Sequence, residues 1–335
     1  MPEKIPVTVL TGYLGAGKTT LLNRILSEDH SQKFAVIVNE FGDIGIDSDL
    51  IVGADEEVFE MNNGCVCCTV RGDLIRIIEG LIKRRGKFDA ILVETTGLAD
   101  PAPVAQTFFA DADVRNATRL DAVVTVADAK WLGNRLKDAP EAKNQIAFAD
   151  VILLNKTDLV SAEEVSEIEA RIGAINPYAK LHRTVNCALP LDAVLRRNAF
   201  DLDRVLEPEP EFLNTHHDHE HHGHEHHAPL GPKHYHDEEM QAVALSVDGD
   251  VDPQKFLPWL QDYVARDGAS ILRLKGIVAF KDEAKRFVFQ GVHMMLEGDL
   301  QREWRQGEKR VSKLVFIGRN LPKDVLRQGF LNCAA

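Results

Sequence analysis

Short apolar runs, rich in Val and Ile, recur along the first half of the chain, and each ends abruptly at polar residues. These runs are residues 7–10, 34–38, 90–93, 122–126 and 151–154. Their length and composition predict buried strands. Many of them are separated by stretches of helical character at residues 18–27, 71–85 and 161–175. We therefore expect an α/β domain with a mainly parallel sheet and helices on both faces.

The polar segments that follow the five runs are TGYLGAGKTT, NEFGDIGID, ETTG, ADA and NKTD. Ligands of open parallel sheets bind outside the carboxyl ends of the strands. Because parallel strands all end at the same edge of the sheet, these segments should lie close together. The sequence thus predicts one site built from five loops.

The segment from Gly12 to Thr19 fits the pattern G-x-x-x-x-G-K-[ST], with a strand before it and a helix after it. This is the P-loop of P-loop NTPases, whose glycines let backbone N–H groups turn inward around phosphates. Lys18 can reach the β- and γ-phosphates, and the Thr19 hydroxyl can bind Mg²⁺. The residues expected at the phosphates are Gly12, Gly15, Ala16, Gly17, Lys18, Thr19 and Thr20.

The segment NKTD predicts which base is bound. The Asp158 carboxylate can accept both the N1 and N2 hydrogens of guanine, a pair that adenine does not offer. Asn155 can contact guanine N7, and the stem of Lys156 can cover the base. After a P-loop and at a strand end, this segment favours GTP over ATP.

Two further segments are candidates for the catalytic side of the site. Glu94, in ETTG, is placed to hold Mg²⁺ through water, and Gly97 can donate its N–H to the γ-phosphate. Asp47, in GDIGID, is a candidate for positioning Mg²⁺ or the attacking water. The alternative for Asp47 is an ordinary carboxylate in a turn.

Three of the five cysteines stand within four residues, as Cys65, Cys67 and Cys68. Three thiolates can hold Zn²⁺ or Co²⁺ with one coordination position left open, and Glu40 is a candidate fourth ligand. A helix beginning near Thr69 would favour the thiolate form. Buried apolar cysteines and a redox pair are the alternatives, although adjacent thiols make strained disulfides.

A histidine tract, HHDHEHHGHEHH, occupies residues 216–227. Imidazole binds Zn, Cu, Co and Ni. The tract has almost no apolar residues, so it cannot offset the entropy cost of ordering. It is expected to be a disordered linker that stores metal or is simply inert. The resulting division is a GTPase domain at 1–206, this linker at 207–238 and a C-terminal domain at 239–335.

The C-terminal segment predicts a smaller α+β domain with a mainly antiparallel sheet. Its expected strands are residues 240–247, 270–280, 285–296 and 309–318, and its expected helices are residues 252–266 and 322–332. We expect His293, inside the third of these strands, to be structural.

The composition of the chain argues against two classes of partner, nucleic acid and membrane. A net charge of −13 repels phosphate backbones, which argues against nucleic acid. No run approaches the roughly 18 apolar residues of a membrane span, and no signal peptide is evident. We expect a soluble, cytoplasmic protein in a reducing compartment, where clustered thiols more often bind metal than form disulfides.

The segments GYLGAGKTT, NEFGDIGID, NNGCVCC, ETTGLADP and NKTD, in this order, resemble the CobW-type family of P-loop GTPases, relatives of nickel-insertion GTPases. RLKGIVAF, FQGVHMMLEGD and KLVFIGRNL resemble that family's C-terminal domain. The resemblance implies a GTP-hydrolysing metallochaperone that delivers Zn²⁺ or Co²⁺ to a client metalloprotein or metal-inserting enzyme, with a nucleotide-dependent homodimer as one form. FQGVH and the histidine tract favour zinc. Alternatives are cobalt delivery for cobalamin synthesis, a metal store or sensor with nucleotide as structural ligand, and a small-molecule kinase, against which NKTD argues.

Overall fold

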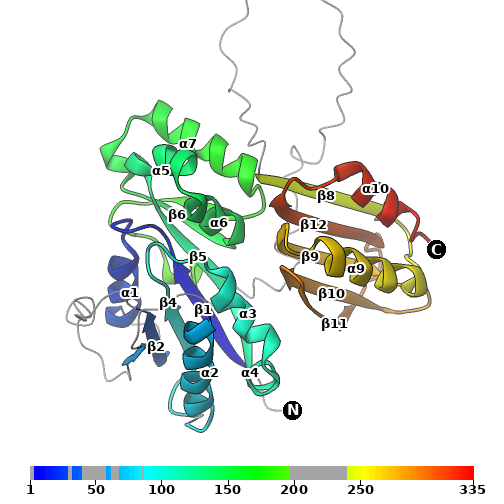
Figure 1. Ribbon diagram of the computed structural model, residues 1–335, viewed down its shortest axis with the longest axis horizontal. Coiled ribbons are helices and arrows are strands. Elements are labelled where there is room, and N and C mark those ends of the chain that lie inside the picture. The colour runs from blue at the N-terminus through cyan, green and yellow to red at the C-terminus, as the bar shows by residue number, and fades with distance from the viewer. Residues whose placement is uncertain (1–3, 29–31, 40–57, 62–67, 85, 196–239) are drawn as a thin grey trace, which may run out of the picture.

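The computed structural model describes residues 4–28, 32–39, 58–61, 68–84, 86–195 and 240–335, and these residues form two sheets (Figure 1). The N-terminal sheet has the strand order β3-β2-β4-β1-β5-β6-β7, and its neighbouring strands are all parallel. Its strands are β1 (Ile5–Thr11), β2 (Phe34–Asn39), β3 (Val58–Met61), β4 (Ala90–Glu94), β5 (Thr118–Asp128), β6 (Val151–Asn155) and β7 (Lys180–Arg183). The predicted parallel α/β fold is confirmed.

Helices cover both faces of the parallel sheet, as predicted. On one face, α1 (Lys18–Ser27) packs its apolar side chains into a core with the sheet. The opposite face is covered by α2 (Cys68–Ile82), α3 (Ala102–Ala110), α4 (Ala112–Ala117), α5 (Ala129–Asp138), α6 (Pro140–Phe148) and α7 (Ala162–Ile175). Helix α7 begins where the sequence predicts because Ser161 and Glu164 form a capping box, each side chain bonding the other's backbone N–H.

The two outermost strands, β3 and β7, are not predicted by the sequence. β7 is four residues long, and its side chains are all exposed or half-buried. β3 is equally short. An edge strand is paired on one side only and needs no continuous apolar run, so its sequence carries a weaker strand signal.

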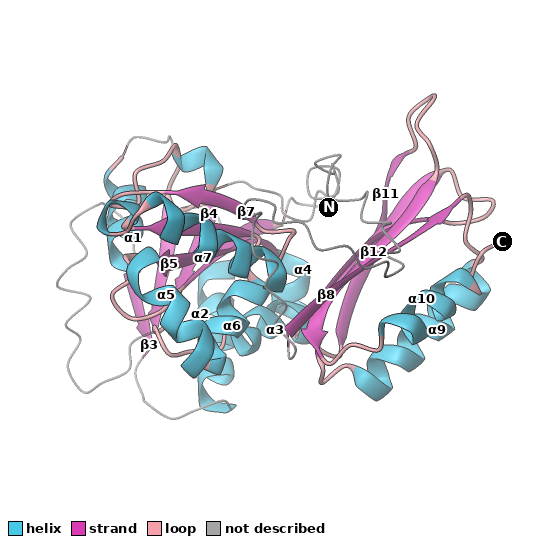
Figure 2. Ribbon diagram, turned by 90° about the horizontal axis from the view of Figure 1, so that it is seen from above, coloured by secondary structure: helices cyan, strands magenta, loops and turns pink. Residues whose placement is uncertain are grey.

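The C-terminal sheet has the order β11-β10-β9-β12-β8, and all its strand pairs are antiparallel. Its strands are β8 (Met240–Asp248), β9 (Ile271–Ala279), β10 (Lys285–Val292), β11 (Met295–Glu303) and β12 (Val311–Arg319). The helices α9 (Pro253–Asp267) and α10 (Lys323–Leu331) pack on the face turned away from the parallel sheet (Figure 2). The predicted α+β class is confirmed for this part of the chain.

One expected strand, residues 285–296, is two strands in the structure. β10 ends at Val292, and β11 begins at Met295, its register partner. Between them His293 adopts a left-handed φ of 52°. The assignment of His293 to a strand was therefore wrong. A two-residue hairpin without Gly or Asn gives no turn signal in the sequence.

The free face of the C-terminal sheet packs against α3, α6 and α7, and apolar residues from both sheets share one core. A buried ionic cluster lies in this interface. Asp150, between α6 and β6, accepts hydrogen bonds from Lys275 and Arg273 of β9 and from the backbone N–H of Val123. Burial alone would raise the pKa of Asp150, but the Lys275 and Arg273 charges outweigh it and hold that pKa below its usual value.

We predict that Asp150→Ala lowers the free energy of unfolding by about 3–5 kcal/mol, because it removes the carboxylate that the buried Arg273 and Lys275 share. Urea denaturation measures this loss. The control is Asp248→Ala, which breaks the exposed ion pair between Asp248 and Lys309 and should cost no more than about 1 kcal/mol. Equal losses in the two variants would show that the buried cluster does not hold the two sheets together.

Candidate functional site

The P-loop, Gly12–Thr19, joins the end of β1 to the start of α1. The buried ammonium of Lys18 donates a hydrogen bond to the carbonyl oxygen of Gly12, at 2.8 Å. The loop therefore closes around the side chain of its own lysine. Gly17 caps α1 in a left-handed conformation without a side-chain hydrogen bond, so the first N–H groups of the helix face the site. This arrangement suits the β- and γ-phosphates of a nucleotide.

Two P-loop glycines are required by close neighbours. A Cβ on Gly12 would lie 2.1 Å from the Val126 carbonyl oxygen of β5, and φ is 139°. A Cβ on Gly17 would lie 2.6 Å from the Asn155 amide nitrogen, with φ at 118°. Gly15 also has a positive φ, 75°, but a Cβ there would meet nothing within 4 Å. Gly15 is therefore constrained by its conformation alone.

Asn155, at the end of β6, is only 2% exposed and binds the P-loop directly. Its Nδ2 donates to the Ala16 carbonyl oxygen at 2.9 Å. Its Oδ1 accepts from the Thr184 hydroxyl at 3.1 Å and from the Cys187 backbone N–H at 2.9 Å. The carbonyl oxygen of this amide is thus fully used, which leaves one Nδ2 hydrogen for a base.

The other two residues of NKTD differ in their surroundings. Lys156 has a left-handed φ of 62°, and its ammonium donates to the Gly15 carbonyl oxygen at 2.6 Å and to Asp128 at 2.8 Å. Its stem therefore crosses the outer side of the P-loop. Asp158 is exposed, and its carboxylate makes no hydrogen bond or ion pair with a described residue. It remains available to a ligand.

Two site residues were missed by sequence reasoning. Asp128 ends β5, accepts from the Lys130 N–H as the cap of α5, and fixes Lys156. In the sequence, Asp128 belongs to ADA, a polar segment that follows a predicted strand, but no role was predicted for this segment. Cys187 follows β7, and its buried thiol donates to the Gly17 carbonyl oxygen. Burial raises the pKa of Cys187 to about 11, so it stays protonated and unreactive at neutral pH.

The loop after β4, residues 95–101, lies against the P-loop; we call it the β4 loop. Its Thr95 donates backbone and hydroxyl hydrogen bonds to the Leu10 carbonyl oxygen, and its hydroxyl also reaches Thr11. Glu94, just before it, is 4% exposed and pairs in register with Leu10 of β1. A Cβ on Gly97 would lie 2.6 Å from the Leu14 backbone nitrogen. The structure thus brings Glu94 and Gly97 to the P-loop.

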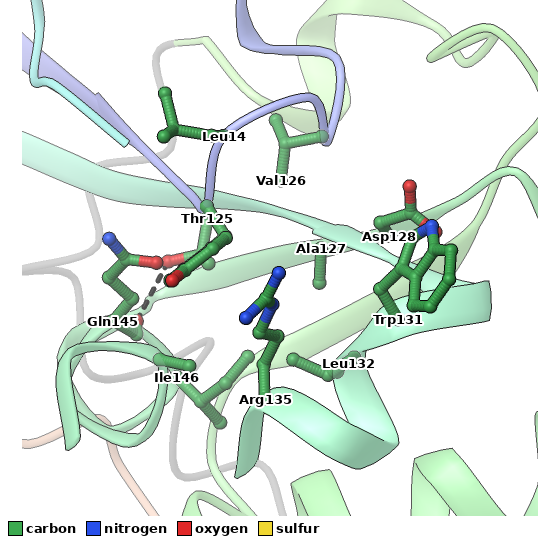
Figure 3. Close-up of a pocket in the computed structure, with 12 residues that line it drawn as sticks. Leu14, Thr125, Val126, Ala127, Asp128, Trp131, Leu132, Arg135, Gln145 and Ile146 are labelled. Carbon is green, nitrogen blue, oxygen red and sulfur yellow. Dashed lines mark hydrogen bonds between the residues drawn. The ribbon is translucent and has the colours of Figure 1, made fainter. Parts of the chain in front are cut away.

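A cavity of about 230 Å³ lies beside the P-loop (Figure 3). It is enclosed by Tyr13 and Leu14 of the P-loop, the end of β5, and helices α5 and α6. The Arg135 guanidinium points into it and lies 4.7 Å from the centre of the Tyr13 ring, a cation–π contact. The cavity therefore adjoins the outer side of the phosphate loop.

Several predicted site residues fall outside the described part of the chain. These are Glu40, Asp47, Cys65, Cys67 and the histidine tract. Cys68 is the first residue of α2, but its side chain is not described. Their roles stay predictions. Among the residues that the structure does describe, no helix is long and apolar enough to cross a lipid bilayer.

Comparison with known proteins gives two family matches. Residues 6–183 match the CobW/HypB/UreG nucleotide-binding domain, and residues 240–334 match the cobalamin synthesis protein CobW C-terminal domain. Among curated relatives, the zinc chaperone CobW of Pseudomonas aeruginosa is 36% identical over 96% of this chain and 90% of its own. The zinc chaperone YjiA of Escherichia coli is 32% identical over 97% of this chain and 98% of its own.

A third relative is the zinc-regulated GTPase metalloprotein activator 1 of Schizosaccharomyces pombe, 34% identical over 95% of this chain and 83% of its own. Among solved structures, the Zn(II)-bound YjiA GTPase of E. coli has a TM-score of 0.72 and 27% identity, and it covers 99% of this chain and 100% of its own. A triple variant of YjiA, with one glutamate and two cysteines replaced by alanine, also holds Zn(II).

We predict that Gly12→Ala weakens nucleotide binding at least about 100-fold, because its Cβ would collide with the backbone oxygen of Val126, 2.1 Å away. The control is Gly15→Ala, which shares the positive φ but meets no neighbour and should cost only the roughly 1–2 kcal/mol of a left-handed residue. Equilibrium binding of a fluorescent guanine nucleotide measures both. Similar losses would contradict the role of close packing at Gly12.

Proposed function

The chain belongs to the CobW/HypB/UreG family of nucleotide-binding proteins, and on this basis we propose that it is a GTP-hydrolysing zinc chaperone. In this function GTP and water become GDP and phosphate, and the cycle controls the binding and release of Zn²⁺. The relatives named above supply the metal, since they are zinc chaperones and a zinc-regulated GTPase. The recipient would be a client metalloprotein.

The nucleotide-binding part of this proposal rests on the convergence of two loops, the one that follows β6 and the β4 loop, on the P-loop. Asn155 holds it from β6, Lys156 crosses its outer side, and Gly97 approaches Leu14 from the β4 loop. The phosphates would lie on the N–H groups at the start of α1. The exposed Asp158 carboxylate would take the guanine N1 and N2 hydrogens.

Hydrolysis by this site would rest on positioning and charge. Lys18 would stabilise the negative charge that develops on the β- and γ-phosphates, and the Gly97 N–H would hold a γ-phosphate oxygen. The site also fits a magnesium ion. Thr19, whose hydroxyl can bind the ion, is the second residue of α1, and the Glu94 carboxylate is buried at the adjacent strand end. When bound, Mg²⁺ would neutralise phosphate charge. Asp47 stays a candidate for orienting the attacking water.

We predict that Asp158→Asn lowers affinity for guanine nucleotides and raises affinity for xanthine nucleotides, whose O2 accepts a hydrogen bond where guanine donates one. Competition against a fluorescent guanine nucleotide measures both. Asp262→Asn, a change of the same size on the exposed side of α9, is the control and should change neither affinity. Wild-type protein that binds ATP as tightly as GTP would refute the guanine assignment.

For the metal half, we propose that Cys65, Cys67 and Cys68 bind Zn²⁺, with Glu40 as a fourth ligand. Support comes from the thiolate chemistry of zinc and from the start of α2 at Cys68, since a helix N-terminus stabilises thiolates. Co²⁺ has the same ligand preferences and would be the competitor at this site. The histidine tract would act as a low-specificity reservoir of the same metal.

The cysteine segment lies between two loops that would respond to the γ-phosphate, residues 39–47 and the β4 loop. GTP would draw both loops towards the P-loop and change how the ligands converge. Linkage requires reciprocity: if GTP tightens zinc binding, zinc must tighten GTP binding by the same factor. A nucleotide-dependent homodimer remains a prediction within this cycle.

We predict that zinc affinity differs by about 5–150-fold between GDP and a non-hydrolysable GTP analogue, the usual range of coupling between two sites. A chelator competition titration measures it in each nucleotide. Cys67→Ser should remove the difference, whereas Cys333→Ser, which replaces a buried cysteine of the C-terminal domain, should retain it.

The YjiA triple variant keeps Zn(II), so total zinc content is not a sufficient readout for the proposed site. The test therefore rests on how zinc affinity changes with the bound nucleotide. Equal zinc affinity of the wild-type protein with GDP and with the GTP analogue would contradict the coupling. The protein would then be a metal store whose GTPase activity is independent of zinc.

A further inference from the structure

Two adjacent buried amides on α6 have no place in the P-loop or the base site. Asn144 is 6% exposed and Gln145 is 2% exposed. Buried amides need hydrogen-bond partners, and those of these two amides lie in two different parts of the molecule, the β4 loop and the C-terminal sheet.

Gln145 fastens the β4 loop to the sheet. Its Nε2 donates to the carbonyl oxygens of Gly97 and Ala99, each at 3.2 Å. The backbone carbonyl oxygen of Gln145 accepts from the Thr125 hydroxyl of β5 at 2.8 Å (Figure 3). Gln145 thus fixes the carbonyl group of Gly97, the residue of the β4 loop that approaches Leu14 of the P-loop.

Asn144 extends this contact to the C-terminal domain. Its Nδ2 donates to the Asp100 carboxylate at 2.9 Å, and its Oδ1 accepts from the Arg319 guanidinium at 2.8 Å. Asp100 lies near the end of the β4 loop and accepts a hydrogen bond from the N–H of Ala102, the first residue of α3. Arg319 is the last residue of β12. One amide therefore bridges the β4 loop and the C-terminal sheet.

The amide of Asn144 can point in only one direction. A flip would place its NH₂ group against the Arg319 guanidinium and its oxygen against the Asp100 carboxylate, losing both hydrogen bonds. The bridge therefore transmits a displacement of Asp100 instead of absorbing it by rotation. Hydrogen bonds to charged groups are also stronger than neutral ones.

The same helix is attached to the C-terminal domain at two further points. Phe148, at the end of α6, packs its ring 5.9 Å from that of His293 in the β10–β11 turn. Asp150, two residues on, is held by Arg273 and Lys275. Burial lowers the pKa of His293, the nearby Asp100 carboxylate opposes this shift and Arg319 adds to it, so the turn lies beside the bridge. α6 and the C-terminal sheet thus form one continuous contact.

We propose that Gln145 and Asn144 are positioning residues for the β4 loop, and that the Asp100–Asn144–Arg319 bridge couples the bound nucleotide to the C-terminal domain. This inference rests on the proposed GTPase function. A γ-phosphate that draws Gly97 towards the P-loop pulls on Gln145 and displaces Asp100, three residues on, relative to Asn144. The C-terminal sheet then differs between the GTP and GDP states, so a client bound there senses the nucleotide.

The test is backbone hydrogen exchange of the full-length protein with Mg²⁺ and either GDP or a non-hydrolysable GTP analogue. In the wild type, amides of β12 and of the His293 turn should exchange at rates that differ at least about fivefold between the two nucleotides. Asn144→Asp, nearly identical in shape, repels the Asp100 carboxylate and should reduce this difference to below about twofold. Arg319→Gln, which breaks the other half of the bridge, should do the same.

The matched control is Arg310→Gln, one residue before β12. Among the described residues, Arg310 forms hydrogen bonds only within the C-terminal domain, to Asp250 and to the carbonyl oxygens of Phe280 and Glu283. This variant should loosen the domain yet keep the nucleotide-dependent difference, which separates coupling from loss of stability.

Three results overturn the inference. The first is a wild-type protein that hydrolyses GTP but exchanges identically in both nucleotides. The second is an Asn144→Asp protein that keeps the full difference, and the third is a control variant that loses it. Failure of the wild type to bind GTP at all, measured in the same samples, would instead overturn the proposed function and the inference with it.

Discussion

The loops at the carboxyl edge of the parallel sheet depend on one buried side-chain amide, that of Asn155. The P-loop must turn its N–H groups towards a ligand, so several of its carbonyl oxygens point back into the protein and need donors there. Asn155 supplies one donor to Ala16, and its oxygen simultaneously fixes Thr184 and Cys187. The first residue of NKTD is thus also the residue that holds the P-loop, so one side chain links the segment proposed to bind the base to the loop proposed to bind the phosphates.

Other carbonyl oxygens of the loop are satisfied in the same way. Lys18 donates to Gly12, and Lys156 donates to Gly15 while Asp128 fixes its ammonium. Gly12, Gly17 and Gly97 let β5, Asn155 and Leu14 approach more closely than a Cβ would permit. These contacts within the chain fix the conformation of the loop, which lowers the ordering cost of binding a ligand there.

The C-terminal domain is fastened to this machinery by polar groups as well as by a shared apolar core. Asp150 lies between two cations of β9, and Asn144 lies between an anion and a cation. Such groups are costly to separate from their partners in a low-dielectric interface. They fix the orientation of the two sheets more sharply than apolar contacts, which tolerate sliding.

The sequence by itself determined the parallel fold, the P-loop between β1 and α1, and the approach of NKTD and Gly97 to that loop, because these depend on short segments at the ends of predicted strands. The edge strands and the His293 hairpin could not be predicted from the sequence. The edge strands carry no continuous apolar run, and the hairpin has no Gly or Asn at its turn. Only the tertiary structure decided the roles of Asp128, Gln145 and Asn144. Arg319 meets Asn144 across 175 positions of the chain, and a partner that distant leaves no pattern in either local sequence. What such an amide does depends on which charges the folded chain brings to its two ends.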